Sequence, residues 1–121
     1  MSAPAAPARS GLRWEVRLWL AQRLTAALLA ICVLVHLVTI ILAVRGGLSA
    51  AEIVARTRGS LAWLSFYGLF VLAVAIHAPI GLRTILTEAV GWRGRSLDLA
   101  MALFALAVLG AGWRTVLGLY R

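Results

Sequence analysis

The sequence predicts an all-α membrane protein with three transmembrane helices in an up-down-up bundle. Of its 121 residues, 63% are hydrophobic and 13% are charged, a balance outside that of ordinary soluble domains. The apolar residues form three runs of about 20 or more residues, the length that crosses a hydrocarbon core roughly 30 Å thick. Short connections that carry arginine separate these runs, which leaves no room for a soluble domain.

The basic residues are all arginine. There are twelve of them against four acidic residues, so the formal charge is +8. The arginines lie at or near the ends of the apolar runs rather than on one basic face, which is typical of charges that orient a membrane protein and anchor it at lipid headgroups. The sequence therefore predicts contact with membrane lipid and no nucleic-acid partner. The single cysteine, Cys32, lies in the first run and is predicted to be a buried apolar residue.

Residues 1–17 are predicted to form a disordered and interfacial segment ahead of a three-helix anchor over residues 18–121. The first ten residues are rich in Pro and Ala and have no periodicity. Residues 11–19 then alternate Arg and Trp with apolar residues, a pattern typical of the membrane interface, and lead into the first helix. The run that follows is too long for the apolar region of a signal peptide and has no cleavage site behind it.

The three transmembrane helices are predicted over about residues 20–44, 61–87 and 97–117. The first is stopped by Arg45 and the two glycines that follow it. In the first connection, Ser49 is followed three residues later by glutamate, which is the spacing of a capping box and predicts a short interfacial helix.

Arginine counts predict that the N-terminus faces the cytoplasm. The N-terminal side carries seven arginines: Arg9, Arg13, Arg17, Arg23, Arg83, Arg93 and Arg95. The opposite side carries five: Arg45, Arg56, Arg58, Arg114 and Arg121.

Small residues are predicted to let the helices approach closely, because packing in lipid does not depend on the hydrophobic effect. They are Ala62, Gly68, Ala73, Ala75, Ala78 and Gly81 on the second helix and Gly110, Ala111 and Gly112 on the third. Three helices make a thin bundle, so we expect a partner in the membrane, either a second membrane-anchor subunit or another copy of this chain.

The second helix carries ionisable residues, which are costly in a membrane and are therefore candidates for function. Three residues lie within about 40° of His77 around this helix and form one stripe with it: Gly81, Thr84 and Glu88. A neutral imidazole one turn from a glycine suits a flat porphyrin with an axial histidine. The alternative is that His77 hydrogen-bonds a neighbouring helix and Gly81 serves close packing; the spacing alone leaves both open.

Two arginines are predicted to share one depth. Arg23 lies just after the start of the first helix and Arg83 just before the end of the second, so in an up-down hairpin both can reach a common pocket. With the Thr25 hydroxyl they can bind a quinone carbonyl or haem propionates. The alternative is that both arginines extend to lipid headgroups.

His36 is predicted to lie at another depth, roughly 12 Å from that of His77 at 1.5 Å per residue. The two histidines should therefore not clamp the same haem. His36 is predicted to be either an interhelical hydrogen-bond donor or a ligand for a second, outer haem.

Two segments resemble a known family. Residues 77–83 (HAPIGLR), followed by Glu88, resemble the H-x-x-x-G-x-R motif, with an acidic residue five places after the arginine, in the cytochrome b556 membrane-anchor subunit of succinate dehydrogenase. Residues 22–26 (QRLTA) resemble the H-R-x-S-G segment of its first helix. The length and the three-helix layout also fit, so the resemblance covers the chain from about Leu18.

The resemblance implies a role for each matching residue. His77 would be the axial ligand to the iron of haem b, which a partner subunit would share. Arg23 and Thr25 would lie at the quinone pocket beside the iron–sulfur subunit, and Arg83 and Glu88 would hold the cytoplasmic end of the haem and quinone region.

The chain departs from the family pattern at three positions. Thr84 stands where the family often has a histidine that contacts a haem propionate, and we include it among the candidate cofactor-binding residues. Gln22 replaces the histidine of the first segment, and Ala26 replaces its glycine.

The resemblance implies a non-catalytic electron-transfer subunit of a succinate dehydrogenase or fumarate reductase type complex. It would bind haem b and quinone and pass electrons between the iron–sulfur subunit and membrane quinone, with a flavoprotein subunit as a further partner. The residues themselves provide no phosphate loop, carboxylate pair or nucleophile of an enzyme. The alternative is a small transporter or a cofactor-free structural membrane subunit.

Overall fold

The computed structural model describes residues 2, 3 and 9–121. Its helices are α1 (Arg9–Arg45), α2 (Ala50–Thr57), α3 (Leu61–Val90) and α4 (Arg95–Tyr120). The described residues include no β-strand. α1, α3 and α4 are long and apolar enough to cross a membrane, which confirms the prediction of an all-α membrane protein with three spans.

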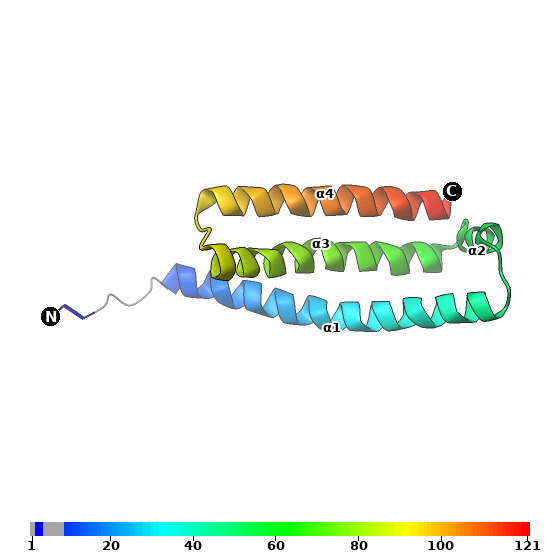
Figure 1. The fold of residues 1–121 in the computed structure, drawn as a ribbon, viewed down its shortest axis with the longest axis horizontal. Helices are drawn as coiled ribbons and strands as arrows, with labels where there is room; N and C mark the ends of the chain where they lie inside the picture. The colour runs from blue at the N-terminus through cyan, green and yellow to red at the C-terminus, as the bar shows by residue number, and fades with distance from the viewer. Residues whose placement is uncertain (1, 4–8) are drawn as a thin grey trace.

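The three long helices lie side by side, with α3 in the middle and α2 at one end (Figure 1). α3 packs against both α1 and α4. Neighbouring helices are antiparallel, since Thr25 of α1 meets His77 of α3 and His36 meets Tyr67. The predicted up-down-up order is confirmed.

α1 begins earlier than the predicted transmembrane helix. It starts at Arg9 and runs unbroken to Arg45, so the predicted interfacial segment is the first part of this helix. The predicted disordered tail falls largely on residues 1 and 4–8, which lie outside the described residues. The predicted end at Arg45 is observed, and Gly47 takes a φ of 69° in the turn that follows.

α2 begins with the predicted capping box. The Ser49 backbone N–H donates to Glu52 Oε2 at 2.7 Å, and Ser49 Oγ accepts from the Glu52 N–H at 3.3 Å. The hydrogen bond from the Ser49 backbone is the main cause that holds the pKa of the exposed Glu52 carboxyl below its usual value.

The far end of α2 is fixed to the end of α4. Thr57 Oγ1 donates to the Leu119 carbonyl at 3.2 Å, and the Gly59 N–H donates to the Tyr120 carbonyl at 2.8 Å. These bonds satisfy carbonyls that the last turn of α4 leaves without an intrahelical donor. They hold α2 across the end of the bundle.

Small residues set the distance between α3 and α4. A Cβ at Gly112 would lie 2.7 Å from Val71 Cγ1, and one at Gly68 would lie 3.4 Å from the Trp113 ring. A Cβ at Gly110 would meet no described atom within 4 Å. Close packing between α3 and α4 is therefore observed at the predicted small positions Gly68 and Gly112.

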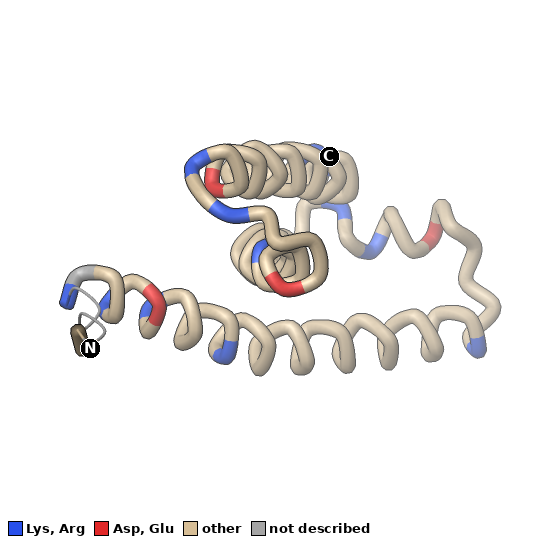
Figure 2. The backbone as a smooth tube through the Cα atoms, turned by 60° about the vertical axis from the view of Figure 1, so that its left-hand side comes forward, with Lys and Arg blue, Asp and Glu red and all other residues tan. Residues whose placement is uncertain are grey.

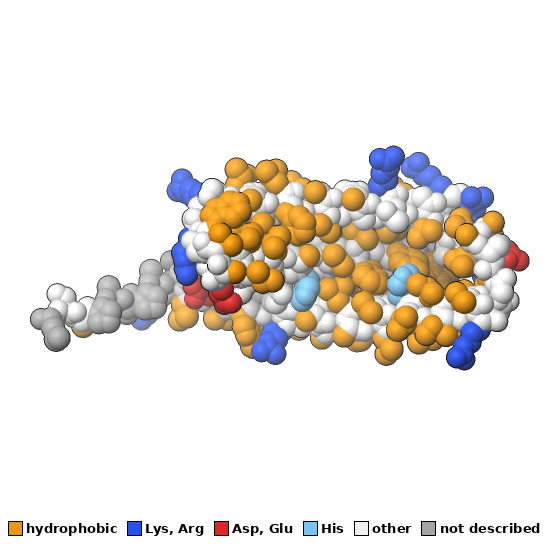
Figure 3. Space-filling model, in the orientation of Figure 1, with side chains coloured by type: hydrophobic (Ala, Val, Ile, Leu, Met, Phe, Trp, Pro, Cys, Tyr) orange, Lys and Arg blue, Asp and Glu red, His pale blue; other side chains and the backbone are white. Residues whose placement is uncertain are grey.

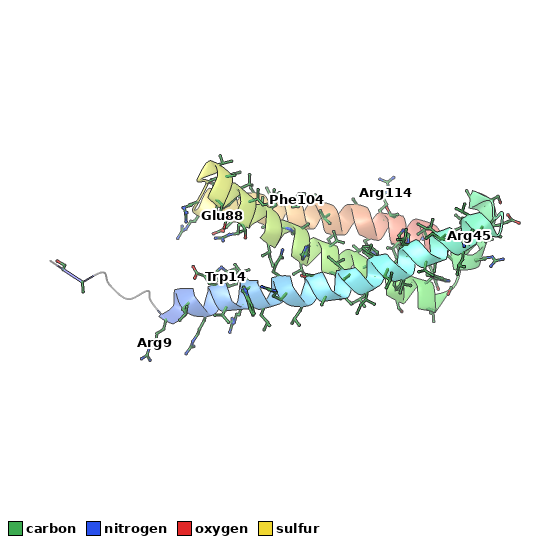
Figure 4. All side chains as sticks on the ribbon, turned by 60° about the horizontal axis from the view of Figure 1, so that its bottom comes forward. Arg9, Trp14, Arg45, Glu88, Phe104 and Arg114 are labelled. Atoms are coloured by element: carbon green, nitrogen blue, oxygen red, sulfur yellow. The ribbon has the colours of Figure 1, made fainter. Side chains whose placement is uncertain are left out.

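Charged residues gather toward the two ends of the bundle (Figure 2). Between Arg23 and Arg45 α1 carries no charge. The labelled side chains in Figure 4 show the same division, with Arg9 and Glu88 toward one end and Arg45 toward the other. Apolar side chains cover much of the surface between the ends (Figure 3), as expected for a surface that faces lipid.

Candidate cofactor site

The centre of the candidate site is a contact between α1 and α3. Thr25 Oγ1 lies 3.2 Å from His77 Nδ1. The Thr25 hydroxyl also donates to the Ala21 carbonyl at 2.6 Å, with the Gln22 carbonyl at 3.2 Å. A hydroxyl has one proton, and here it is directed at the backbone, so His77 Nδ1–H must be the donor to Thr25. The Nε2 atom of His77 then carries the free lone pair.

Both members of this contact are held firmly. Thr25 is buried, with 8% of its surface exposed, and its bond to the carbonyl one turn earlier is the usual arrangement of a threonine inside a helix. His77 is half-buried, on a stretch of α3 that continues through the buried Pro79. The ring is thus fixed by α1 on one side and partly open on another.

Gly81, one turn from His77, faces Gln22 of α1. A Cβ at Gly81 would lie 3.1 Å from Gln22 Nε2. The Gln22 Oε1 atom is buried and has no hydrogen-bond partner. An acceptor without a donor is costly in an apolar interior, so this oxygen marks a place beside His77 where a donor from outside the chain would be stabilised.

Thr84 and Glu88 continue the His77 stripe toward the end of α3. Thr84 Oγ1 donates to the Ile80 carbonyl at 3.1 Å, and both side chains are exposed. The structure brings neither into hydrogen-bonding contact with His77 among the described residues. They lie on the open surface of the chain.

Arg83 pairs with a residue that the sequence analysis did not single out. Its Nε atom lies 3.0 Å from Asp98 Oδ1 of α4, and 36% and 58% of the two side chains are exposed. Asp98 is the one aspartate of the chain and lies in the first turn of α4. A lone aspartate near the start of the helix that follows α3 could have identified this pair from the sequence, because the connection between α3 and α4 is short.

Arg23 lies over the Trp19 ring, with its guanidinium carbon 5.3 Å from the ring centroid, a cation–π contact one turn along α1. Arg23 and Thr25 are about 160° apart around the helix. Since Thr25 faces α3, Arg23 faces away from it and is exposed. The structure therefore places Arg23, Thr25 and Arg83 in three different surroundings rather than around one pocket within this chain.

His36 forms a second polar contact between α1 and α3. Its Nδ1 atom lies 3.2 Å from the Tyr67 hydroxyl, and its ring meets those of Tyr67 and Phe70 edge to face. The structure thus shows the interhelical hydrogen bond that one of the two predictions for His36 expected. The sequence analysis missed Tyr67 as its partner.

Cys32 is buried as predicted, with 2% of its surface exposed.

Comparison with known proteins decides the family. Residues 2–112 match the family model of the succinate dehydrogenase/fumarate reductase transmembrane subunit. The chain belongs to this family. No curated protein and no solved structure matches it.

Family membership and the fold agree. A succinate dehydrogenase/fumarate reductase transmembrane subunit crosses the membrane several times, as α1, α3 and α4 do. It is part of a complex with soluble subunits. The family resemblance predicted from the motifs around Thr25 and His77 is confirmed.

Proposed function

We propose that this chain is the haem b and quinone-binding anchor of its complex and passes electrons between an iron–sulfur subunit and membrane quinone. A quinone is soluble in lipid and an iron–sulfur protein is not, so electrons have to cross between the two phases. Haem b, when bound, supplies a one-electron carrier within the membrane. The residues that follow are those through which this chain would serve that transfer.

The observation that carries the proposal is the contact between His77 and Thr25. Metal-ligating histidines commonly donate their second ring N–H to a fixed acceptor, which sets the tautomer and the direction of the ring. Thr25 Oγ1, 3.2 Å from His77 Nδ1, is such an acceptor. The unprotonated Nε2 would then be the axial ligand to the haem iron.

The residues around His77 fit a bound porphyrin in their chemistry. His77 is half-buried, so part of its ring is open to a partner subunit, which would supply the second face of the site. The Gln22 Oε1 atom, which has no partner among the described residues, offers an acceptor to a donor group of the partner subunit. Gly81 makes room at this level for the Gln22 side chain of α1, and the Gln22 Nε2 donors can reach a propionate.

The other candidate residues would act toward the end of the bundle that carries the N-terminus. Arg23 and Trp19 face outward from α1, and we propose that they contribute to the quinone pocket at the contact with the iron–sulfur subunit. Arg83, Thr84 and Glu88 would hold the polar edge of the cofactor region.

The proposed partners follow from this arrangement. The iron–sulfur subunit, and a flavoprotein subunit behind it, would dock at the end with the N-terminus, which we propose is the cytoplasmic side of a bacterial inner membrane. A second membrane-anchor subunit or another copy of this chain would cover the open side of His77.

The test is a reduced-minus-oxidised optical spectrum of the detergent-purified complex, co-expressed with its neighbouring subunits, for wild type and His77→Ala. We expect a low-spin b-haem band that disappears in the variant while the chain is still inserted. Succinate–quinone activity is measured in parallel, together with the elution volume of the complex.

Each outcome has a distinct meaning. A wild-type complex without a haem band but with quinone activity would remove haem from the proposal and leave a quinone-site anchor. A wild-type complex with neither a haem band nor quinone activity would support a structural subunit or a transporter instead. A band that survives in His77→Ala would show that His77 is not the ligand.

A further inference from the structure

A second site lies at the end of the molecule that carries α2. It is a cleft of about 920 Å³ lined by residues of all four helices, near the upper limit of about 1,000 Å³ for small-molecule pockets. Its lining is mainly apolar and includes Ile40, Leu48, Phe70, Val71 and Leu119. None of the residues proposed above to hold haem or quinone lines it.

The walls of this cleft are fixed. Thr57 and Gly59 hold α2 on the end of α4, while α1 and α4 each pack on α3. The face drawn in Figure 3 is hollowed beside one of the two histidines, toward the α2 end, and His36 is the histidine that lines the cleft. The space therefore exists as part of the fold and opens at the surface of the bundle.

Most polar groups in the lining are already satisfied. The hydroxyls of Thr39, Thr57 and Thr115 each donate to a helix carbonyl, at 2.8 to 3.2 Å. The lining groups that can still donate to a ligand are the Trp63 indole N–H, the ring of His36 with its Tyr67 partner, and the Arg56 guanidinium, which is the one charged group among them. A ligand of this cleft should therefore be largely apolar, with an anionic acceptor at one end.

The charge at this end also favours an anion. Five of the twelve arginines lie here, and Glu52 is the one acidic residue beside them. The Glu52 carboxylate accepts the Ser49 N–H at the start of α2, and within residues 9–121 the one ion pair, Arg83 with Asp98, is at the opposite end. A guanidinium at headgroup level attracts the phosphate of an anionic lipid by charge and by hydrogen bonding.

We propose that this cleft binds one anionic phospholipid, with an acyl chain along Phe70 and Val71 and the phosphate on Arg56. α2 lies across the end of the bundle, as an interfacial helix does, and so carries Arg56 at headgroup level. The inference does not rest on haem or quinone binding, so the two can fail separately.

The experiment uses the full chain in phosphatidylcholine vesicles with trace phosphatidylglycerol or phosphatidylcholine that carries a nitroxide on its acyl chain. Electron paramagnetic resonance reports how much of each label is immobilised. We expect an immobilised component about fivefold larger for phosphatidylglycerol, the effect of one arginine near a headgroup. Arg56→Gln should abolish this preference.

Two further variants separate the site from its surroundings. Arg58→Gln makes the same charge change two residues away, outside the lining, and should keep the preference. Ala43→Leu fills part of the cleft and leaves every charge in place, so it should remove the immobilised component for both labels. Elution volume and helix content confirm that each variant is folded.

Three results would overturn the proposal. Equal loss of the phosphatidylglycerol preference in Arg56→Gln and Arg58→Gln would mean that the lipid responds to diffuse surface charge. An undiminished immobilised component in Ala43→Leu would mean that the acyl chain lies outside the cleft. Immobilised lipid with the isolated chain but none after assembly with the co-expressed subunits would mean that a partner's helix fills the cleft.

Discussion

The two contacts that α3 makes with its neighbours are built differently. Toward α4, contact depends on shape, with Gly112 packed on the Val71 side chain. Toward α1, the contact contains two polar pairs, of which the pair between Thr25 and His77 is one. Close packing is the main source of helix association in lipid, whereas polar residues there are costly and mark function. Within the apolar span, α3 therefore packs on α4 by shape, whereas its contact with α1 contains the polar candidates for function; the Arg83–Asp98 pair lies toward the end of the bundle.

The two histidines on the α1–α3 side differ in a way that predicts different roles. The Thr25 hydroxyl gives its proton to Ala21, so His77 has to donate through Nδ1 and keeps a lone pair on Nε2. The Tyr67 hydroxyl has no other described partner, so it can donate to His36 and leave the proton on Nε2. Under the proposed function, His77 would thereby be the metal ligand, and His36 would keep an Nε2–H that can donate.

The largest expected effect is the loss of the b-haem band, which tests directly whether the two histidines have different roles. His77→Gly should remove the b-haem band completely, and imidazole added to the purified complex should restore it, because the glycine leaves room for the free ligand. His36→Gly should keep the band without imidazole. The measurement is the optical difference spectrum of each variant. A band lost in His36→Gly and retained in His77→Gly would reverse the assignment.

The next effect tests why His77 is different. Thr25→Val keeps the shape of the side chain but removes the acceptor for His77 Nδ1–H, and loss of such a partner typically lowers metal-site affinity by about 10–100-fold. Thr25→Ser keeps the hydroxyl and should stay close to wild type. Haem titration of the cofactor-depleted complex and the midpoint potential provide two readouts. If valine and serine behaved alike, Thr25 would be a packing residue.

Much of the fold could be predicted from the sequence, because three membrane-length apolar runs admit few arrangements. The glycines after Arg45 and the capping box at Ser49 also fixed local structure correctly, since these depend on neighbouring residues alone. The start of α1 at Arg9 could not be predicted from hydropathy, because a helix can extend beyond the lipid core into the interface. Its boundary follows backbone hydrogen bonding rather than the apolar run.

The candidate site was less predictable. His77 was identified from its cost in a membrane, but its contact with Thr25 depends on the rotation of α1 about its own axis. That rotation turns Arg23 away from α3 and toward Trp19. The depth of a residue in the membrane can be estimated from residue counts. The direction in which its side chain points depends on how the two helices pack, which residue counts do not give.

A smaller effect should distinguish the α4 side of α3 from the α1 side. Gly112→Ala would place a methyl group 2.7 Å from Val71 Cγ1, and overpacking of this kind typically costs about 1–3 kcal/mol. Gly110→Ala has open space and should be neutral or gain up to about 1 kcal/mol from helix propensity. Unfolding in denaturing detergent gives both values. Equal effects would mean that α3 and α4 are not in close contact at Gly112.

The smallest effect concerns Arg83, which can act as a structural partner of Asp98 or as a cofactor-binding residue. The pair is largely open to solvent, and exposed ion pairs contribute about 0–1 kcal/mol, so Asp98→Asn should lower stability slightly and leave the haem spectrum and quinone activity unchanged. Arg83→Gln removes the same pair and, under the proposed function, should also lower quinone activity or shift the haem potential. Identical behaviour of the two variants would assign Arg83 to the link between α3 and α4. A defect confined to Arg83→Gln would place the arginine at the polar edge of the cofactor and would show that this role does not depend on its 3.0 Å contact with Asp98.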